Sequence, residues 1–236
     1  MSIAENVARI RAEMEAAAIA AGRDPRSILL CAATKMNDAE AVREAIAAGV
    51  DCCGENKVQE LTAKLAENAY EGAPVHFIGH LQTNKVKFVV GKVDLIQSVD
   101  SERLLAAIDK EAKKQGIIQN ILLEVNVGLE ESKSGFHPDD ILPLMDKIPE
   151  YPNIRVKGLM TIPPISQKNG DNVKFFQKMC NISVDIIAKK EDNDMAKYLS
   201  MGMSDDFADA IANGSTMIRV GTAIFGARDY TKLHQT

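Results

Sequence analysis

The sequence lacks the features that mark a partner of nucleic acids or membranes. Its formal net charge is -5 and its basic residues are scattered, so no basic surface for a nucleic acid or an anionic membrane is predicted. No apolar run approaches the length of a membrane-spanning helix. Charged residues are spread through the first thirty positions, which leaves no apolar region of a signal peptide there. These absences predict a cytoplasmic protein with no nucleic-acid partner and no membrane partner.

Cysteine pairs and metal-binding spacings are missing as well. The four cysteines form no CxxC pair, and Cys31, Cys52 and Cys53 fall in apolar, strand-like runs. Buried, reduced thiols are the simplest interpretation. The histidines show no ligand spacing, so no metal site is predicted. They are His76, His80, His137 and His234.

What the chain of 236 residues does have is an alternation of short β-rich runs with helical runs. An amphipathic helix is expected over 2–21, with Ile3, Val7 and Ile10 at helical spacing. The strands are then expected at 28–34, 50–53, 75–79, 94–99, 120–127, 154–160, 197–201 and 216–221. Helices are expected at 37–48, 55–68, 83–89, 101–115, 138–147, 171–190 and 204–213.

Eight strands that alternate with helices predict an α/β fold of the (β/α)8 TIM barrel type, which takes about 250 residues. An open, doubly wound sheet is the alternative, but no GxGxxG motif follows the first strand. We therefore expect a single domain over 1–236. It would consist of an extra N-terminal helix at 2–21, the barrel at 27–226 and a short C-terminal tail.

The first strand ends on the lysine that makes the site recognisable. Six apolar residues from Ile28 to Ala33 are followed by Thr34 and Lys35, as in a strand buried on both faces of a parallel sheet. Ligands bind at the carboxyl ends of such strands. Partial burial there lowers the pKa of a lysine and raises the fraction of neutral amine. A neutral amine attacks an aldehyde to form a Schiff base, whereas a lysine that only ends a strand points into water.

The last two strands end in residues suited to a phosphate. Barrels often bind phosphate between the loops after strands 7 and 8. Ser200, Ser204 and Thr222 offer hydroxyl groups in these loops, and Gly221 lets the backbone approach a ligand closely. Arg219 stands in an apolar strand, where its charge needs a partner or a ligand. A Schiff-base lysine, a phosphate site and a buried arginine together point to pyridoxal 5'-phosphate.

Other loops on the same side of the barrel carry polar residues. Asn56 follows the second strand and would lie beside Lys35, because the first two strands are neighbours. His80 follows the third strand and is a candidate acid–base group, although a lone histidine there more often makes structural hydrogen bonds. The polar loop at 126–136 has the composition of a mobile, solvated lid.

Several motifs resemble those of the pyridoxal phosphate homeostasis protein family, whose fold is that of the alanine racemase barrel domain. The resemblance spans residues 33 to 226 in family order. The motifs are ATK at 33–35, GENKVQE at 54–60, HFIGHLQTNK at 76–85, SKSG at 132–135, GLM at 158–160, LSMGMSDD at 199–206 and GSTMIRVGTAIFG at 214–226.

The resemblance implies a role for each candidate residue. Lys35 would form the internal aldimine, Arg219 would face the pyridine nitrogen, and Asn56 would lie beside the ring. The phosphate would be held by Ser200, Ser204, Gly221 and Thr222. The chain departs from the family at Thr34, where serine is common, and at Lys57, where tyrosine is frequent. Thr34 keeps a hydroxyl, and Lys57 makes the rim of the site more basic.

Three functions are compatible with these motifs. The first is a non-catalytic carrier that holds the cofactor as a lysine aldimine and serves its homeostasis and delivery, with PLP-dependent apoenzymes as possible recipients. The second is an amino-acid racemase, and the third is an interaction scaffold, which the motifs disfavour. A racemase of this fold takes a proton donor for the opposite face from a second domain. This chain ends near its barrel and offers only His80 or Tyr230 for that face, so the carrier is favoured. Both a monomer and a homodimer remain compatible with the sequence.

Overall fold

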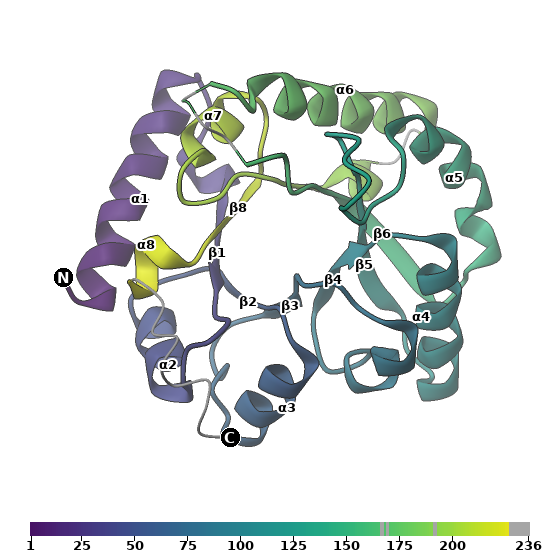
Figure 1. Ribbon diagram of the computed structural model, residues 1–236, viewed down its shortest axis with the longest axis horizontal. Coiled ribbons are helices and arrows are strands. Elements are labelled where there is room, and N and C mark those ends of the chain that lie inside the picture. The colour runs from purple at the N-terminus through teal and green to yellow at the C-terminus, as the bar shows by residue number, and fades with distance from the viewer. Residues whose placement is uncertain (166–167, 169, 191–192, 227–236) are drawn as a thin grey trace.

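The computed structural model describes residues 1–165, 168, 170–190 and 193–226. Within them, eight parallel strands form a closed barrel in which each strand pairs with the next and β8 pairs with β1. Figure 1 shows the helices arranged around this barrel. The strands are β1 (Leu29–Ala33), β2 (Cys52–Glu55), β3 (Val75–Phe77), β4 (Leu95–Val99), β5 (Gln119–Glu124), β6 (Ile154–Met160), β7 (Tyr198–Ser200) and β8 (Met217–Val220).

The strands are linked by α-helices and by short 3₁₀ helices. The α-helices are α1 (Ile3–Ala20), α2 (Ala39–Ala47), α3 (Val58–Ala66), α4 (Glu102–Gln115), α5 (Ile141–Lys147), α6 (Val173–Lys190), α7 (Phe207–Ala212) and α8 (Thr222–Phe225). The 3₁₀ helices are η1 (Pro25–Ser27), η2 (Thr83–Phe88), η3 (Pro138–Asp140), η4 (Ile148–Glu150) and η5 (Asn193–Ala196).

The predicted (β/α)8 barrel is confirmed, and every predicted strand overlaps an observed one. Two local features differ from the expectation. The segment expected as a helix at 83–89 is the 3₁₀ helix η2, a form that proteins use for short connectors. The short helix α8 after β8 was not among the predicted helices, because four residues are too few to show a helical period.

The extra N-terminal helix covers the side of the barrel where β8 pairs with β1 (Figure 1). Ser2 caps α1 by accepting a hydrogen bond from the Glu5 N–H, and the Glu5 carboxylate accepts one from the Ser2 N–H. The helix lies along the outside of β1 and β8 (Figure 1) and packs against α2, α7 and α8. Asn6 Nδ2 donates a hydrogen bond of 2.9 Å to the backbone oxygen of Ile224 in α8. The helix therefore fixes the segment that follows β8.

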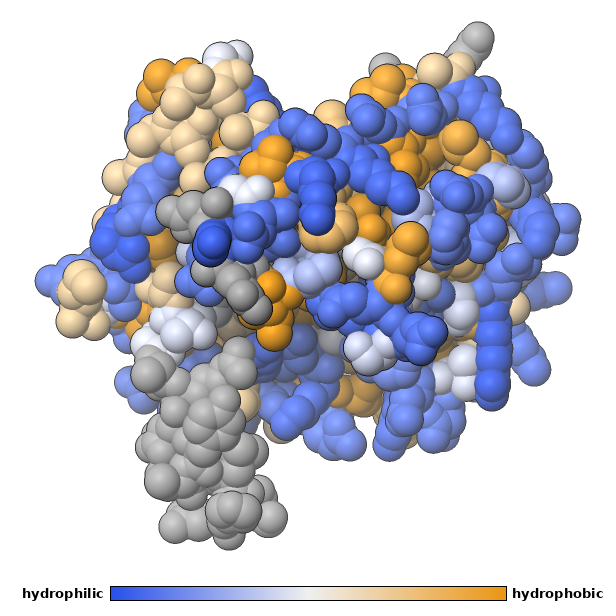
Figure 2. All heavy atoms as spheres, turned by 45° about the horizontal axis from the view of Figure 1, so that its top comes forward, coloured by the Kyte–Doolittle hydropathy of each residue, from blue (hydrophilic) through white to orange (hydrophobic). Residues whose placement is uncertain are grey.

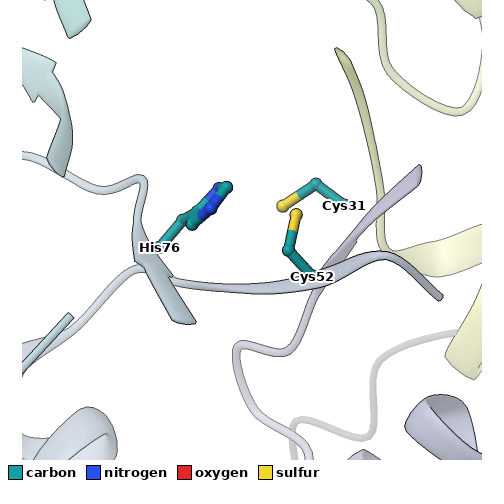
Figure 3. Close-up of side chains that lie close together, drawn as sticks. All are labelled: Cys31, Cys52 and His76. Atoms are coloured by element: carbon teal, nitrogen blue, oxygen red, sulfur yellow. The ribbon is translucent and has the colours of Figure 1, made fainter. Parts of the chain in front are cut away.

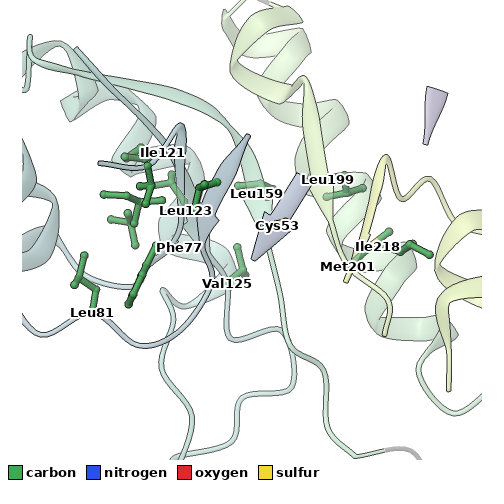
Figure 4. Packing of buried hydrophobic residues seen from close by; sticks show 14 of the residues in the cluster. Cys53, Phe77, Leu81, Ile121, Leu123, Val125, Leu159, Leu199, Met201 and Ile218 are labelled. Atoms are coloured by element: carbon green, nitrogen blue, oxygen red, sulfur yellow. The ribbon is translucent and has the colours of Figure 1, made fainter. Parts of the chain in front are cut away.

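The hydrophobic core has two layers, because successive side chains of a strand point to opposite faces. In β1, Leu30 and Ala32 face outward and join the large cluster between the strands and the helices. Figure 4 shows part of that outer cluster, including Phe77 and Leu123. Cys31 faces the barrel interior, where it joins a second cluster. The members of the inner cluster are Cys31, Cys52, Leu95, Leu122, Met160 and Met217.

Hydrophilic side chains cover most of the face seen in Figure 2, with hydrophobic ones scattered among them. Among the described residues, no helix has both the length and the apolar character that crossing a bilayer requires.

Candidate functional site

Lys35 lies in a tight turn directly after β1, at the carboxyl end of the barrel. Its neighbour Met36 adopts a positive φ of 62°, a conformation that non-glycine residues rarely take. The turn is closed by a hydrogen bond of 3.2 Å from the Asn37 N–H to the Thr34 oxygen. The Met36 N–H donates a hydrogen bond of 2.6 Å to Glu60 Oε2 of α3. The lysine is therefore carried by a turn that the neighbouring β/α unit holds in place.

A buried ion pair supports this turn from below. Lys64 Nζ lies 2.6 Å from Glu55 Oε2, and the two side chains are 7% and 0% exposed. The same ammonium group donates a hydrogen bond of 2.7 Å to the backbone oxygen of Thr34. Glu55 Oε2 also accepts hydrogen bonds from the Thr34 hydroxyl and from Tyr70. Several hydrogen bonds to the carboxylate offset the cost of burying these charges, and the network ends one residue from Lys35.

Asn56 is brought to the site by a close approach of two loops. A side chain at Gly79 would place its Cβ 2.1 Å from the backbone oxygen of Asn56, so only glycine allows the loops after β2 and β3 to pack this way. The side-chain oxygen of Asn56 is buried and accepts no hydrogen bond from the described residues. Buried polar atoms normally have partners, and this oxygen is therefore a candidate ligand contact.

Arg219 points from β8 into the barrel interior and is 5% exposed. Its Nη1 donates a hydrogen bond of 2.6 Å to the Ser200 hydroxyl oxygen, and its Nη2 donates one of 2.7 Å to the backbone oxygen of Thr161. Burial lowers the pKa of the guanidinium group, while nearby Cys31 and Glu124 act in the opposite direction. Two short hydrogen bonds fix the orientation of the arginine.

These residues surround one cavity of about 470 Å³ at the carboxyl ends of the strands. Six of the seven predicted site residues line it. They are Lys35, Asn56, Ser204, Arg219, Gly221 and Thr222. The other lining residues are Ala33, Ile78, Ile162, Met203, Asp205 and Ala223. The cavity thus combines an amine, a guanidinium group, two hydroxyls and an unpartnered amide oxygen on partly apolar walls.

Ser200 is the predicted site residue that lies outside this lining. Its side chain is fully buried. Its hydroxyl donates a hydrogen bond of 2.7 Å to Gln97 Oε1 and accepts one from Arg219. The hydroxyl is therefore engaged inside the barrel, one layer below the cavity. Contact of Ser200 with the cavity is indirect, through Arg219.

The loop from β7 to α7 presents Ser204 at the rim of the cavity. Gly202 begins this loop with a φ of 94°, and a Cβ there would lie 2.6 Å from the Cβ of Ala210. The Met203 N–H then donates 2.7 Å to Asp206 Oδ1. Asp206 in turn accepts a hydrogen bond of 2.8 Å from Asn172 Nδ2. The loop is held by its own polar contacts, which leave the half-buried Ser204 facing the cavity.

Two interior polar residues were not predicted from the sequence. Glu124, at the end of β5, is 7% exposed. Burial raises the pKa of its carboxyl group to about 7, with Asp100 raising it further and Arg219 lowering it. Gln97 of β4 is fully buried and accepts the Ser200 hydrogen bond. The signal that would have found them is a polar residue in an apolar strand, which had already drawn attention to Arg219.

His80 and Tyr230 were the two candidates for a proton donor on the face opposite Lys35, and the structure describes only the first of them. The His80 side chain is 60% exposed, and its Nδ1 lies 3.0 Å from Asp100 Oδ2 and 3.4 Å from the Ser134 hydroxyl. It is not among the residues that line the cavity. Tyr230 lies outside the described residues. Lys57 is 56% exposed and lies 3.5 Å from Glu60, and it is not among the residues that line the cavity.

The chain is similar over nearly its whole length to known proteins. The model of the alanine racemase N-terminal domain matches residues 2–229. A pyridoxal phosphate homeostasis protein of Aquifex aeolicus is 40% identical over 230 residues, which is 98% of this chain and 100% of that protein. A protein of Bifidobacterium adolescentis has a TM-score of 0.88 at 40% identity, over 94% of both chains. PipY of Synechococcus elongatus, solved with PLP bound, has a TM-score of 0.81 at 32% identity, over 95% of this chain and 100% of that one.

Proposed function

This chain belongs to the pyridoxal phosphate homeostasis protein family, and on that premise we propose that it binds pyridoxal 5'-phosphate in the cavity beside Lys35. The cofactor would be held covalently by Lys35 Nζ. Non-catalytic storage and delivery of the cofactor would be the biological role. The cytoplasmic location and the recipient apoenzymes expected from the sequence remain predictions.

The donor set of the cavity fits this cofactor group by group. Pyridoxal phosphate, when bound, supplies an aldehyde that reacts with amines, a pyridine nitrogen and a phosphate. Lys35 provides the amine. Ser204 and Thr222 provide hydroxyl donors for phosphate oxygens, and Gly221 provides a backbone that a ligand can approach. The unpartnered oxygen of Asn56 is the observation on this structure that most directly calls for a ligand.

Arg219 has a defined part in this proposal. Its hydrogen bonds to Ser200 and to the Thr161 backbone hold the guanidinium group at the wall of the cavity. A guanidinium group is a donor only and keeps its protons, so an arginine that faces the pyridine nitrogen discourages protonation of that nitrogen. An unprotonated ring is a weaker electron sink. The arginine thus favours holding the cofactor over using it in catalysis.

Racemisation further requires an acid–base group on each face of the cofactor. Lys35 can serve one face. Of the other cavity-lining side chains that the structure describes, only Arg219 and Asp205 are ionisable, and Asp205 is exposed. The exposed His80 is engaged by Asp100. An amino-acid racemase is the alternative function, and this arrangement favours the carrier over it.

The convergence of Lys35, Asn56 and Arg219 on one cavity is the observation that carries the proposal. To test it, the purified protein is loaded with pyridoxal phosphate and incubated in deuterated water with a panel of L- and D-amino acids. We expect exchange at Cα no faster than with free cofactor, and transfer of cofactor to an added PLP-dependent apoenzyme. The matched variants are Lys35→Ala and, as a control outside the cavity lining, Lys57→Ala. Fast exchange with inversion that disappears in His80→Ala would instead identify a racemase.

A further inference from the structure

Three side chains from three neighbouring strands converge inside the barrel below the cavity. Cys31 of β1 and Cys52 of β2 are direct partners in the sheet register, and His76 comes from β3. Figure 3 shows the two sulfur atoms turned toward each other and the imidazole ring on the same side of the sheet. The side chains are 0%, 2% and 6% exposed. One ligand atom from each lies within 4.8 Å of the others.

This spacing is close to that of a metal site. Metal–thiolate bonds of about 2.3 Å and metal–imidazole bonds of about 2.0 Å place the donors of one ion roughly 4 Å apart. The observed separations, at most 4.8 Å, need to close by less than about 1 Å.

We propose that Cys31, Cys52 and His76 form a binding site for one thiophilic d10 cation, Cu⁺. Thiolates and imidazole are soft to borderline donors, which select Cu⁺ or Zn²⁺ and disfavour Mg²⁺ and Ca²⁺. Among the described residues, three such donors come together here. Structural Zn²⁺ sites almost always have four ligands, so a set of three soft donors favours Cu⁺.

The surroundings match the charge and the chemistry of this ion. A metal-binding cysteine must be deprotonated, so binding of the ion displaces the thiol protons. Two thiolates and Cu⁺ carry one net negative charge, and the buried Arg219 supplies the compensating positive charge. Leu95 and Leu122 belong to the same interior cluster and keep water from the ion.

Gln97 supplies the outer contact that orients the histidine. Ligating histidines commonly hydrogen-bond through their other ring nitrogen, and Gln97 already lies against Nδ1 of His76. Rotation of this amide by a half turn presents Oε1 to an Nδ1–H, which leaves Nε2 of the imidazole for the metal. The amide Nε2 of Gln97 then faces the Ser200 hydroxyl oxygen, which accepts from it in place of the hydrogen bond that the hydroxyl donates in the metal-free protein. Gln97 also connects the site, through Ser200, to Arg219. The inference does not depend on the proposed function of the cavity.

The test is an anaerobic titration of the fully reduced protein with Cu⁺ in competition with a chromogenic Cu⁺ chelator. Loading is done both by prolonged incubation and by refolding in the presence of the ion, because the site is buried. We expect one tightly bound equivalent and a thiolate-to-copper absorption band. In parallel titrations, Zn²⁺ should bind more weakly than Cu⁺, and Mg²⁺ should not bind. Absence of a tight equivalent after both loading procedures, or tighter binding of Zn²⁺ than of Cu⁺, overturns the proposal.

Variants locate the site. Cys31→Ser and Cys52→Ser should each weaken Cu⁺ binding by more than about 100-fold, since loss of an outer-shell partner alone costs about 10–100-fold. Cys180→Ser is the matched control, because Cys180 lies on α6 outside the barrel, and it should bind Cu⁺ as the wild type does. Equal losses in the control overturn the proposal.

A second measurement on the wild type does not depend on the variants folding. The X-ray absorption spectrum of the copper-loaded protein should show two short sulfur ligands and one nitrogen ligand. A shell of sulfur alone, or of nitrogen and oxygen alone, contradicts the site.

Discussion

Arg219 Nη1 donates a hydrogen bond of 2.6 Å to the hydroxyl oxygen of Ser200, and both side chains are buried. The Ser200 hydroxyl in turn donates a hydrogen bond of 2.7 Å to Gln97 Oε1. The same serine was expected to contact phosphate, but these two contacts engage it inside the barrel. We therefore infer that Ser200 acts by positioning the arginine, and that the phosphate contacts come from Ser204, Gly221 and Thr222.

Replacement of Ser200 separates these two roles. Ser200→Ala removes partners from Arg219 and Gln97 and should lower the free energy of unfolding by about 1–3 kcal/mol, the cost of leaving buried polar groups unsatisfied. Its effect on cofactor affinity should be smaller than that of Ser204→Ala, which should leave stability nearly unchanged. Urea denaturation and cofactor titration of the two variants measure this. A stable Ser200→Ala protein that loses more affinity than Ser204→Ala would restore Ser200 as a phosphate ligand.

The buried ion pair under Lys35 should be sensitive to the loss of one partner. Lys64→Met leaves Glu55 as an uncompensated buried charge, and we expect a loss of about 3–5 kcal/mol in the free energy of unfolding. The double variant Glu55→Gln with Lys64→Met should recover part of it. Lys147→Met is the control, because the Lys147–Glu102 pair is exposed on both sides and should matter little. Chemical denaturation of the four proteins gives the comparison, and similar losses for Lys64→Met and Lys147→Met would refute this prediction.

Glu124 makes stability depend on pH. Burial raises the pKa of its carboxyl group from 4.5 to about 7, so the folded protein binds a proton that the unfolded chain has released. The resulting stabilisation is complete below pH 4.5 and is lost as the pH rises to about 7. Relative to Glu124→Gln, the cofactor-free wild type should lose up to about 3 kcal/mol over this interval. Denaturation curves at a series of pH values test this, and parallel curves for the two proteins would contradict it.

The phosphate should hold the cofactor more strongly than the covalent bond does. Charge-assisted hydrogen bonds to phosphate are about twice as strong as neutral ones, whereas the bond to a lysine is readily exchanged with other amines. Lys35→Ala should therefore still bind pyridoxal phosphate, without the absorbance of the lysine-bound form. Pyridoxal, which lacks the phosphate, should bind the wild type poorly. Equal affinity for the two compounds would argue against a phosphate site.

The sequence was sufficient to predict the barrel because its strands are apolar runs that alternate with amphipathic helices. In β1, for instance, residues on both faces are buried, and an uninterrupted apolar run is the pattern that such a strand needs. The cavity could also be predicted. Lys35 and Asn56 follow strands and Arg219 lies near the end of β8, and the carboxyl ends of parallel strands meet at one side of a barrel.

The contacts inside the barrel could not be predicted in the same way. Cys31, Cys52 and His76 belong to different β/α units, and their mutual distances depend on strand register and on barrel closure. The spacing of the histidines along the chain therefore gave no sign of a metal site. The engagement of Ser200 by Gln97 has the same origin, because β4 and β7 face each other only across the closed barrel.

The position of the covalent bond to the cofactor tests the central claim most directly. The wild-type protein is loaded with pyridoxal phosphate, reduced with borohydride, digested and mapped by mass spectrometry. We predict a single labelled peptide that carries the pyridoxyl group on Lys35, since this lysine lies in the turn after β1 and lines the same cavity as Arg219. A label on Lys57 or Lys85, or no label on a protein that binds the cofactor, would contradict the assignment.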